Sequence, residues 1–215
     1  MNKLWAKLRM ASAFLALVRN PQKTEKIFKM ADSGRRSNQE LGMLAMKATL
    51  ENPEFRSLWV ESHNPLIEIA SLRQFQKGTF GRAVADFLDQ NDFTPNGFPK
   101  LDTEAPLDYL SNRMRQTHDL WHVLTGYGPS VPDELALQAF TLAQVGSPLS
   151  ALIIAAGILH LLLYRPLDVT ETFSGIIEGF KRGKACKPLA TMRLESFWSS
   201  DLTLLRSDLG LMITA

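Results

Sequence analysis

The chain has 215 residues, of which 45% are hydrophobic, and a formal net charge of only +2. It is long enough to bury a full core, and its charge excludes the strong basic field typical of nucleic-acid-binding proteins. Its single cysteine, Cys186, excludes an internal disulfide framework and suits a reducing compartment. No linker-like stretch separates two domains, so we expect one compact domain over residues 1–215.

Residues 1–19 are expected to form an amphipathic helix. Apolar residues recur at helical spacing among lysines and an arginine. The apolar run is short and no small-residue cleavage pair follows it, so a signal peptide is the weaker explanation. We expect the helix to pack on the domain, and docking on a membrane surface is the alternative. The apolar positions are Leu4, Leu8, Ala11, Leu15 and Val18.

Apolar side chains at three- and four-residue spacing predict helices through the rest of the chain. One should open at Asn20-Pro21, and residues 91–108, rich in Pro, Asn, Gly and Asp, should form a surface loop. No segment alternates apolar and polar residues at strand length, so the predicted fold class is all-α. The predicted helices cover 37–50, with Leu41, Leu44, Ala45 and Ala48 on the apolar face; 78–90, with Phe80, Val84, Phe87 and Leu88; 109–124; 132–145; 149–164; and 196 onward.

The segment LSALIIAAGILHLLLY, residues 149–164, is apolar on all sides. It is shorter than the ~20 residues of a membrane-spanning helix, so we expect a helix buried all round. Small residues at 155–157 leave room beside its backbone for either another helix or a long apolar ligand. His160 is expected to be a hydrogen-bonded core histidine. A ligand chain would contact Leu152, Ala155, Ala156 and Leu159.

Residues 118–134 carry the pattern most suggestive of chemistry. His118 and His122 are four apart on a predicted helix, so both imidazoles leave one face and can bind one divalent ion at ~2.0–2.1 Å. GYGPSVP then breaks the helix; Ser130 can cap the next one, and Pro132 and Glu134 fall in its first turn. An antiparallel turn would return Glu134 to the histidines, with the helix dipole keeping its carboxylate ionised.

Asp119 lies beside the first histidine and has three open roles: a fourth ligand, a partner of a ligand, or the general base. Glu134 is the second candidate for moving protons. The mixed nitrogen and oxygen ligands favour zinc or another first-row ion, with magnesium still open. Two surface histidines among unrelated carboxylates are the alternative to a metal site.

Arginines near the motif are candidates for holding an anionic substrate. Arg115 is three residues before His118 and shares its helical face, and Arg113 lies on the flank. Beside a metal, guanidinium groups would bind the phosphate or carboxylate of a substrate head group, whereas the alternative is solvated helix charges. Arg82, in GTFGR, is a candidate with weaker support.

These residues resemble those of the coenzyme Q biosynthesis protein 4 family. His118-Asp119-x-x-His122, followed by eleven residues and Glu134, is similar to its HDxxH-x11-E motif, and RMRQT is similar to the run before it. GTFGR with ADFLDQNDFTP resembles another family segment, with Val84 where a tyrosine is usual, and residues 179–211 resemble the C-terminal region. The resemblance spans most of the chain from about residue 15.

The resemblance implies an all-α fold, a role in ubiquinone assembly, and metal ligation, usually of zinc, by the four motif residues. It implies polyprenylated hydroxybenzoate substrates, removal of the ring carboxylate at carbon 1 with hydroxylation there, and contact with other quinone-biosynthesis enzymes. The chain is therefore expected to be a metal-dependent lyase with an apolar groove for the prenyl tail. A non-catalytic prenyl-lipid-binding scaffold is the alternative, and another prenyl quinone or a lipid phosphate stays open as the substrate.

A phosphohydrolase of the HD class is the third hypothesis, with His63 and Asp168 filling its remaining roles, but it leaves His122 and Glu134 without function. No expected helix spans a membrane, so we predict a location in the cytoplasm or on the inner face of a membrane with peripheral contact. The aromatic residues Trp59, Phe197 and Trp198 could form a homodimer face or belong to the core.

Overall fold

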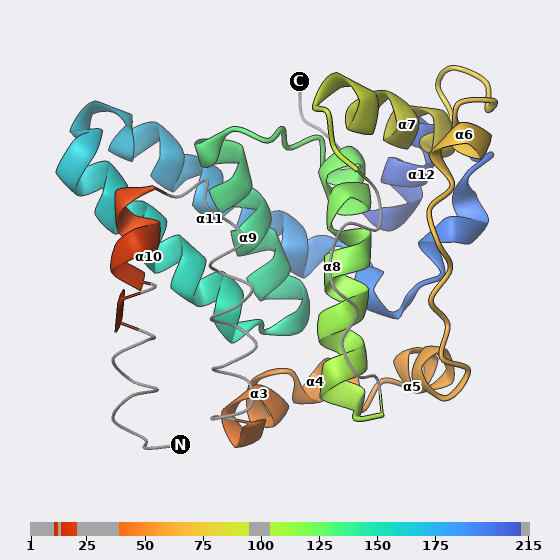
Figure 1. Cartoon of the computed structure of the whole chain (residues 1–215), viewed down its shortest axis with the longest axis horizontal. Helices are drawn as coiled ribbons and strands as arrows, with labels where there is room; N and C mark the ends of the chain where they lie inside the picture. The colour runs from red at the N-terminus through yellow and green to blue at the C-terminus, as the bar shows by residue number, and fades with distance from the viewer. Residues whose placement is uncertain (1–10, 13, 21–38, 95–103, 212–215) are drawn as a thin grey trace. The chain divides into compact units, whose positions relative to one another are not determined.

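The computed structural model of the chain describes residues 11–12, 14–20, 39–94 and 104–211 (Figure 1). Every regular element in these ranges is a helix, which confirms the predicted all-α class. Residues 14–19 are helical before the labelled elements. The labelled helices are α3 (Gln39–Ala45), α4 (Lys47–Leu50), α5 (Pro53–Val60), α6 (Ile69–Leu72), α7 (Phe80–Gln90), α8 (Pro106–Thr125), α9 (Val131–Val145), α10 (Pro148–Tyr164), η1 (Pro166–Asp168), α11 (Val169–Ala185), η2 (Leu189–Thr191), η3 (Leu194–Phe197) and α12 (Leu202–Leu209).

The chain divides into two compact units. Unit 1 consists of Met1–Met46 and Ser130–Lys184, and unit 2 consists of Lys47–Pro129 and Ala185–Ala215. Each unit therefore combines segments from distant parts of the sequence. That the two units work as one domain stays a prediction.

Unit 2 is built around α8, against which α4, α5, α7, α12 and η2 pack. Thr79 begins α7 by accepting a hydrogen bond from the Arg82 amide at 3.4 Å. Glycine suits position 81, because a Cβ there would lie 3.0 Å from the Trp198 carbonyl oxygen, a tight contact. Phe80 stacks on the Trp198 ring with centroids 5.1 Å apart. The GTFGR segment thus has a packing role at the first turn of α7.

The apolar face predicted for α7 is confirmed, because Phe80, Val84 and Leu88 are buried. The aromatic side chains proposed as a dimer face are half-buried, and a dimer stays a prediction. Cys186, which directly follows α11, is a buried free thiol, as expected for a structural cysteine.

Unit 1 is organised by α9, which packs along α10 and against the glycines of α11 (Figure 1). A Cβ at Gly157 of α10 would collide with the Leu135 side chain of α9. A Cβ at Gly179 of α11 would collide with the Ala136 carbonyl oxygen, and one at Gly183 would lie 2.6 Å from that of Phe140. Glycine therefore allows α9 to approach both neighbours closely.

The room predicted beside 155–157 of α10 is largely filled by protein. Leu135 occupies the space at Gly157, and Ala156 packs with Leu17 and Val18 in a buried cluster. His160 is bonded as predicted, because its Nδ1 lies 2.8 Å from the Val18 carbonyl oxygen. Neighbouring helices thus fill the space at positions 156 and 157, whereas Ala155 is exposed.

The prediction that α10 is buried all round is wrong. Its buried residues are only Ser150, Ala156, Gly157 and Leu161, and Leu162 and Leu163 are exposed. Apolar composition shows that a helix avoids water but not how many neighbours cover it. In the described ranges, no helix combines the length and the apolar composition needed to cross a membrane.

The faces predicted for two N-terminal helices are also corrected. Leu15 is 57% exposed while Leu17 and Val18 are buried, and Leu4 and Leu8 lie outside the described residues, as does the helix expected from Asn20-Pro21. Of the helix predicted over residues 37–50, the described part from Gln39 forms two helices separated at Met46. Their expected apolar face is exposed, while the side chains at 46, 49 and 50 are buried.

Two C-terminal elements differ from the prediction. No helix was predicted over α11, although Phe173, Ile177 and Phe180 recur there at helical spacing, and the face that packs on α9 is made of glycines. The last helix begins at Leu202 rather than 196, since Asp201 caps it by accepting a bond from the Leu204 amide at 2.9 Å. Residues 194–197 form a 3₁₀ turn instead.

Candidate metal centre

Helix α8 carries both histidines of the motif. Pro106 stands in its first turn, and Gly126 ends it in the left-handed conformation with φ of 78°. The Gly126 amide donates to the His122 carbonyl oxygen at 2.8 Å, so His122 belongs to the last regular turn. His118 is one turn earlier, and the four-residue spacing places both rings on one side of the helix.

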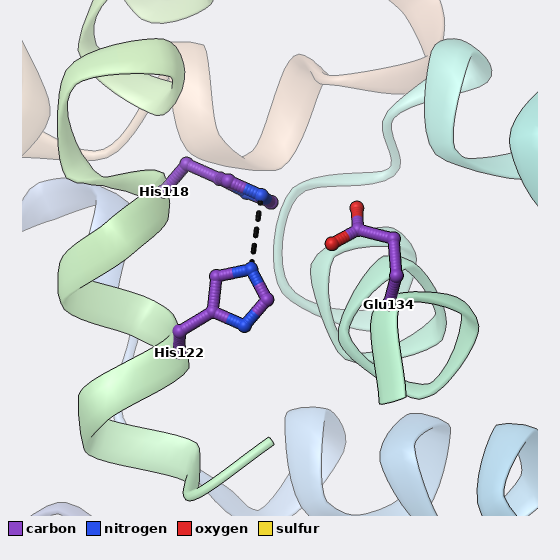
Figure 2. A group of neighbouring side chains, drawn as sticks. All are labelled: His118, His122 and Glu134. Atoms are coloured by element: carbon purple, nitrogen blue, oxygen red, sulfur yellow. Dashed lines mark hydrogen bonds between the residues drawn. The ribbon is translucent and has the colours of Figure 1, made fainter. Parts of the chain in front are cut away.

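The two imidazoles meet through their Nε2 atoms, which lie 3.2 Å apart (Figure 2). His122 is buried and His118 is half-buried. The Nδ1 atom of His122 lies 2.9 Å from the Tyr127 carbonyl oxygen, and because a carbonyl only accepts, this nitrogen carries a proton. In neutral His122 the Nε2 lone pair therefore faces His118, which is the form that a metal requires.

Two further contacts hold the His122 ring and the end of α8 in place. Phe87 of α7 stacks on its ring with centroids 5.3 Å apart and an interplanar angle of 22°. Arg206 of α12 donates to the carbonyl oxygens of Val123 at 2.7 Å and Leu124 at 3.0 Å, which satisfies free carbonyls at the end of α8. Ring orientation and helix end are both fixed within unit 2.

Glu134 stands in the first turn of α9, as predicted from Ser130 and Pro132. The Ser130 hydroxyl oxygen accepts from the Asp133 amide at 3.3 Å, which caps the helix. The buried side chain of Gln138, one turn later, donates to Glu134 Oε1 at 2.7 Å.

His118, His122 and Glu134 form a possible metal site. Each offers one ligand atom, and these atoms all lie within 4.8 Å of one another (Figure 2). Two imidazole nitrogens and one carboxylate oxygen are a donor set that zinc and other first-row divalent ions accept, and three protein ligands leave a position open. Asp119, predicted as a fourth ligand, is half-buried and outside this group.

Arg113, predicted to bind the substrate head group, is buried and paired with a carboxylate of the protein. It is 1% exposed and donates through both terminal nitrogens to the Glu195 carboxylate, at 2.9 Å for Nη2 to Oε2. Nη2 also donates to the Met192 carbonyl oxygen at 3.0 Å. Its guanidinium is thus bonded to groups of the protein, and its predicted role at the head group stays a prediction.

Two opposing effects act on the pKa of Glu195, the carboxylate that pairs with Arg113. Burial by itself raises the pKa of Glu195, but the hydrogen bonds and charge of Arg113 outweigh it, and the pKa is lowered from its ordinary value. Glu195 therefore stays ionised, and the pair locks η3 to α8 inside unit 2.

The other arginine candidates differ from each other. Arg82 donates to Asp86 Oδ1 at 2.7 Å and to the Arg73 carbonyl oxygen at 3.1 Å, so it is bonded locally. Arg115, one turn before His118, is buried in α8. The predicted roles of both arginines stay proposals.

The structure gives no support to a phosphohydrolase of the HD class. His63 Nδ1 lies 2.8 Å from Arg193 Nη1, and its Nε2 lies 3.5 Å from Glu195 Oε2. Asp168 pairs with Arg165 at 2.6 Å. Both side chains have local partners, and neither belongs to the ligand group.

The positions proposed to contact a prenyl tail differ in burial. Ala156 is fully buried against the N-terminal helix, and Leu159 packs on the same cluster. Leu152 is half-buried and Ala155 is exposed. An interior groove at these positions stays a prediction.

Sequence reasoning missed several residues that hold the site. Gln138 could have been found, since it is four residues after Glu134 on the same helix. Phe87 was expected on the apolar face of α7, but nothing indicated that it stacks on His122. The contacts made by Arg206 and by the Tyr127 carbonyl depend on the fold, and no sequence motif indicates them.

A family model described as "Coenzyme Q (ubiquinone) biosynthesis protein Coq4" matches residues 5–214. The chain belongs to the Coq4 family. This confirms the resemblance inferred from the HDxxH-x11-E motif. The match covers nearly all of the 215 residues of this chain.

Relatives and a solved structure agree with this assignment. The chain is 29% identical over 148 residues to the Xenopus laevis "Ubiquinone biosynthesis protein COQ4 homolog, mitochondrial", covering 68% of this chain and 51% of that protein. It is 35% identical over 101 residues to the Leishmania infantum protein of the same name, covering 44% and 54%. The chain thus spans about half the length of these curated relatives.

A crystal structure of a Nostoc punctiforme protein has the same fold as this Coq4-family chain. The TM-score is 0.80 at 24% sequence identity, over 96% of this chain and 99% of that one. At this identity the likeness concerns the fold alone.

Proposed function

We propose that the chain acts in the biosynthesis of ubiquinone or a related prenyl quinone. In this proposal it holds a polyprenyl-tailed hydroxybenzoate beside a divalent cation and promotes loss of the carboxylate at ring carbon 1. The observation that carries it is the group of His118, His122 and Glu134, whose ligand atoms lie within 4.8 Å of one another in a member of the Coq4 family.

The donor set fits a zinc-like ion. The Tyr127 carbonyl fixes the proton of His122 on Nδ1, which leaves Nε2 for a cation, and Gln138 orients the Glu134 carboxylate. A divalent ion held there supplies Lewis acidity toward substrate oxygens. The protein residues supply the rest: they fix the ligand atoms, orient the head group and deliver a proton.

The proton balance of decarboxylation assigns a role to Asp119. When carbon dioxide leaves, the bonding electron pair stays on ring carbon 1, and a proton must reach that carbon. Asp119 adjoins His118 in the chain, is half-buried and lies outside the ligand group, so it is the candidate donor. Arg115, buried one turn before His118, is the candidate partner of the substrate carboxylate.

A polyprenyl tail also decides where the substrate is found. A tail of ~20 carbons gains over ~10 kcal/mol on leaving water, so such a substrate resides in a bilayer or in a carrier. We therefore propose peripheral contact with a membrane, on the side where the other quinone-biosynthesis enzymes act.

Native mass spectrometry of the purified full chain tests the cation. We expect one retained divalent ion in the wild type, and its loss in the His118→Ala, His122→Ala and Glu134→Ala variants. His160→Ala is the matched control, since this histidine bonds Val18 and should leave the ion bound. Equal metal content in all five proteins would refute the site.

Complementation of a strain that lacks its own family member then separates catalysis from scaffolding. An enzyme should lose quinone production in the Glu134→Ala and Asp119→Asn variants while keeping prenyl-lipid binding. Full complementation by a metal-free Glu134→Ala variant would instead establish a non-catalytic lipid-binding scaffold.

A further inference from the structure

Four large side chains are exposed where α10 turns into α11. Leu162, Leu163 and Tyr164 end α10, and Leu167 lies in η1, with exposed fractions between 55% and 94%. We call them the apolar tip; the turn that carries them is seen at the upper left of Figure 1. Contiguous exposed residues of this size typically mark a contact surface.

An apolar stripe continues from the tip along α11. Phe173, Ile177 and Phe180 recur at helical spacing, are 38% to 51% exposed, and lead to Lys184, whose Nζ lies 5.7 Å from the Phe180 ring. The residues by which α11 packs on α9 are the glycines, which have other positions around the helix. The stripe is thus not the face that holds α11 in unit 1.

Cations border the tip and the stripe. Arg165 is 65% exposed and pairs with Asp168, while Lys181 and Lys184 are exposed near the end of α11. The acidic residues Glu171 and Glu178 are exposed but do not share the spacing of the stripe. The last two turns of α11 contain cations and no acid.

We propose that the apolar tip and the stripe form a surface by which unit 1 docks on an anionic lipid bilayer. Leucines insert among acyl chains, Tyr164 suits the interface, and the bordering cations attract anionic head groups. A second copy fits less well, because a two-fold contact would set these cations against their own mates. The inference rests on the proposed function, since a polyprenyl substrate must be reached in its bilayer.

Co-sedimentation with phosphatidylcholine vesicles containing phosphatidylglycerol tests the surface on the full chain without substrate. The Leu163→Glu/Leu167→Glu variant should partition about 100-fold less than the wild type, because two leucines no longer insert. The matched control is Val60→Glu/Leu204→Glu, which makes the same change at exposed positions of unit 2 and should stay within about threefold.

The cations are tested by Arg165→Gln/Lys181→Gln/Lys184→Gln. This variant should lose about tenfold or more in partition to vesicles with phosphatidylglycerol and little to phosphatidylcholine alone. A loss that is equal on both vesicles would contradict the proposed role of charge.

A dye on a single thiol locates the contact independently. Cys186 is the one native cysteine and is buried, so a polarity-sensitive dye will attach selectively to Leu167→Cys or, as a control, to Leu204→Cys. Vesicles should shift the emission of the dye at 167 to the blue and leave that at 204 unchanged.

Three results would overturn the docking surface: no sedimentation of the wild type, an equal loss in both double-glutamate variants, or a dye shift at 204 alone. Light scattering adds a fourth, in which Leu163→Glu/Leu167→Glu dissociates a dimer but keeps vesicle partition, which would make the surface an interface between copies. None of these results changes the metal content, so failure here is distinguishable from failure of the proposed function.

Discussion

Helices α8 and α10 have similar lengths, and both depart from the usual rule that charged side chains are exposed and apolar ones are buried. The buried side of α8 includes Arg113, Arg115 and His122, whereas α10, which is almost wholly apolar, exposes Leu162 and Leu163. The difference shows where composition misleads. A buried charge is retained where a bonded partner meets it, and an apolar side chain stays exposed where a surface has another use.

The largest expected effect comes from breaking the buried pair of α8. Glu195→Ala leaves the guanidinium of Arg113 without its carboxylate and should lower the free energy of unfolding by about 3–5 kcal/mol, measured by urea denaturation. Glu195→Gln, which keeps a hydrogen-bond acceptor, should lose less. A loss below about 1 kcal/mol in the alanine variant would show that the pair contributes little to unit 2.

The same pair gives a pH dependence with a defined sign. Because the folded pKa of Glu195 is lowered, its contribution is complete above the ordinary glutamate pKa of 4.5 and is lost as pH falls through the lower folded value. Acid denaturation of the wild type should show this component below pH 4.5, and Glu195→Gln should lack it. An identical acid transition in both proteins would contradict this assignment.

In unit 1 the close approach of α11 to α9 predicts opposite outcomes for two glycines. A Cβ at Gly179 would collide with the Ala136 carbonyl oxygen, so Gly179→Ala should cost about 1–3 kcal/mol. At Gly175 the new atom would lie 3.8 Å from the Ala136 Cβ, so Gly175→Ala should stabilise by up to about 1 kcal/mol through helix propensity. Thermal unfolding of the two variants should bracket the wild type.

A smaller effect is expected at the end of α8. Arg206→Met keeps the length of the side chain but removes both donors to Val123 and Leu124, and should cost about 1–2 kcal/mol. Because these carbonyls border His122, binding of zinc measured by calorimetry should weaken as well. Unchanged zinc affinity together with lost stability would separate the helix end from the site.

The smallest effect is expected on the exposed part of α10. Leu163→Ser should change the free energy of unfolding by no more than about 0.5 kcal/mol, since the side chain is 59% exposed. Chemical denaturation can measure this, with Leu161→Ser as the buried counterpart on the same helix. Similar losses at both positions would contradict the contrast between exposed and buried faces of α10.

A structural feature could be predicted from the sequence where residues close to it in the chain determine it. Gly126, Ser130 and Pro132 set the boundaries of α8 and α9 by short-range effects, so the positions of His118, His122 and Glu134 on these helices followed from the motif. The partner of Arg113 is 82 residues away, and no pattern near either residue joins them. Its buried pairing with Glu195 could be seen only in the fold.

The errors on the apolar helices have a physical cause too. Periodicity marks apolar faces, but in α11 the apolar residues Phe173, Ile177 and Phe180 are exposed, and the face that packs on α9 is made of glycines. The sequence of α10 is apolar on all sides, and composition alone does not show that neighbouring helices cover only one of them.

The buried thiol of Cys186 makes the chain its own reporter of local opening. A thiol reagent reaches this sulfur only when the segment after α11 separates from its surroundings, so the rate of modification counts those excursions. The rate of local opening can therefore be measured on the natural sequence, without an added mutation.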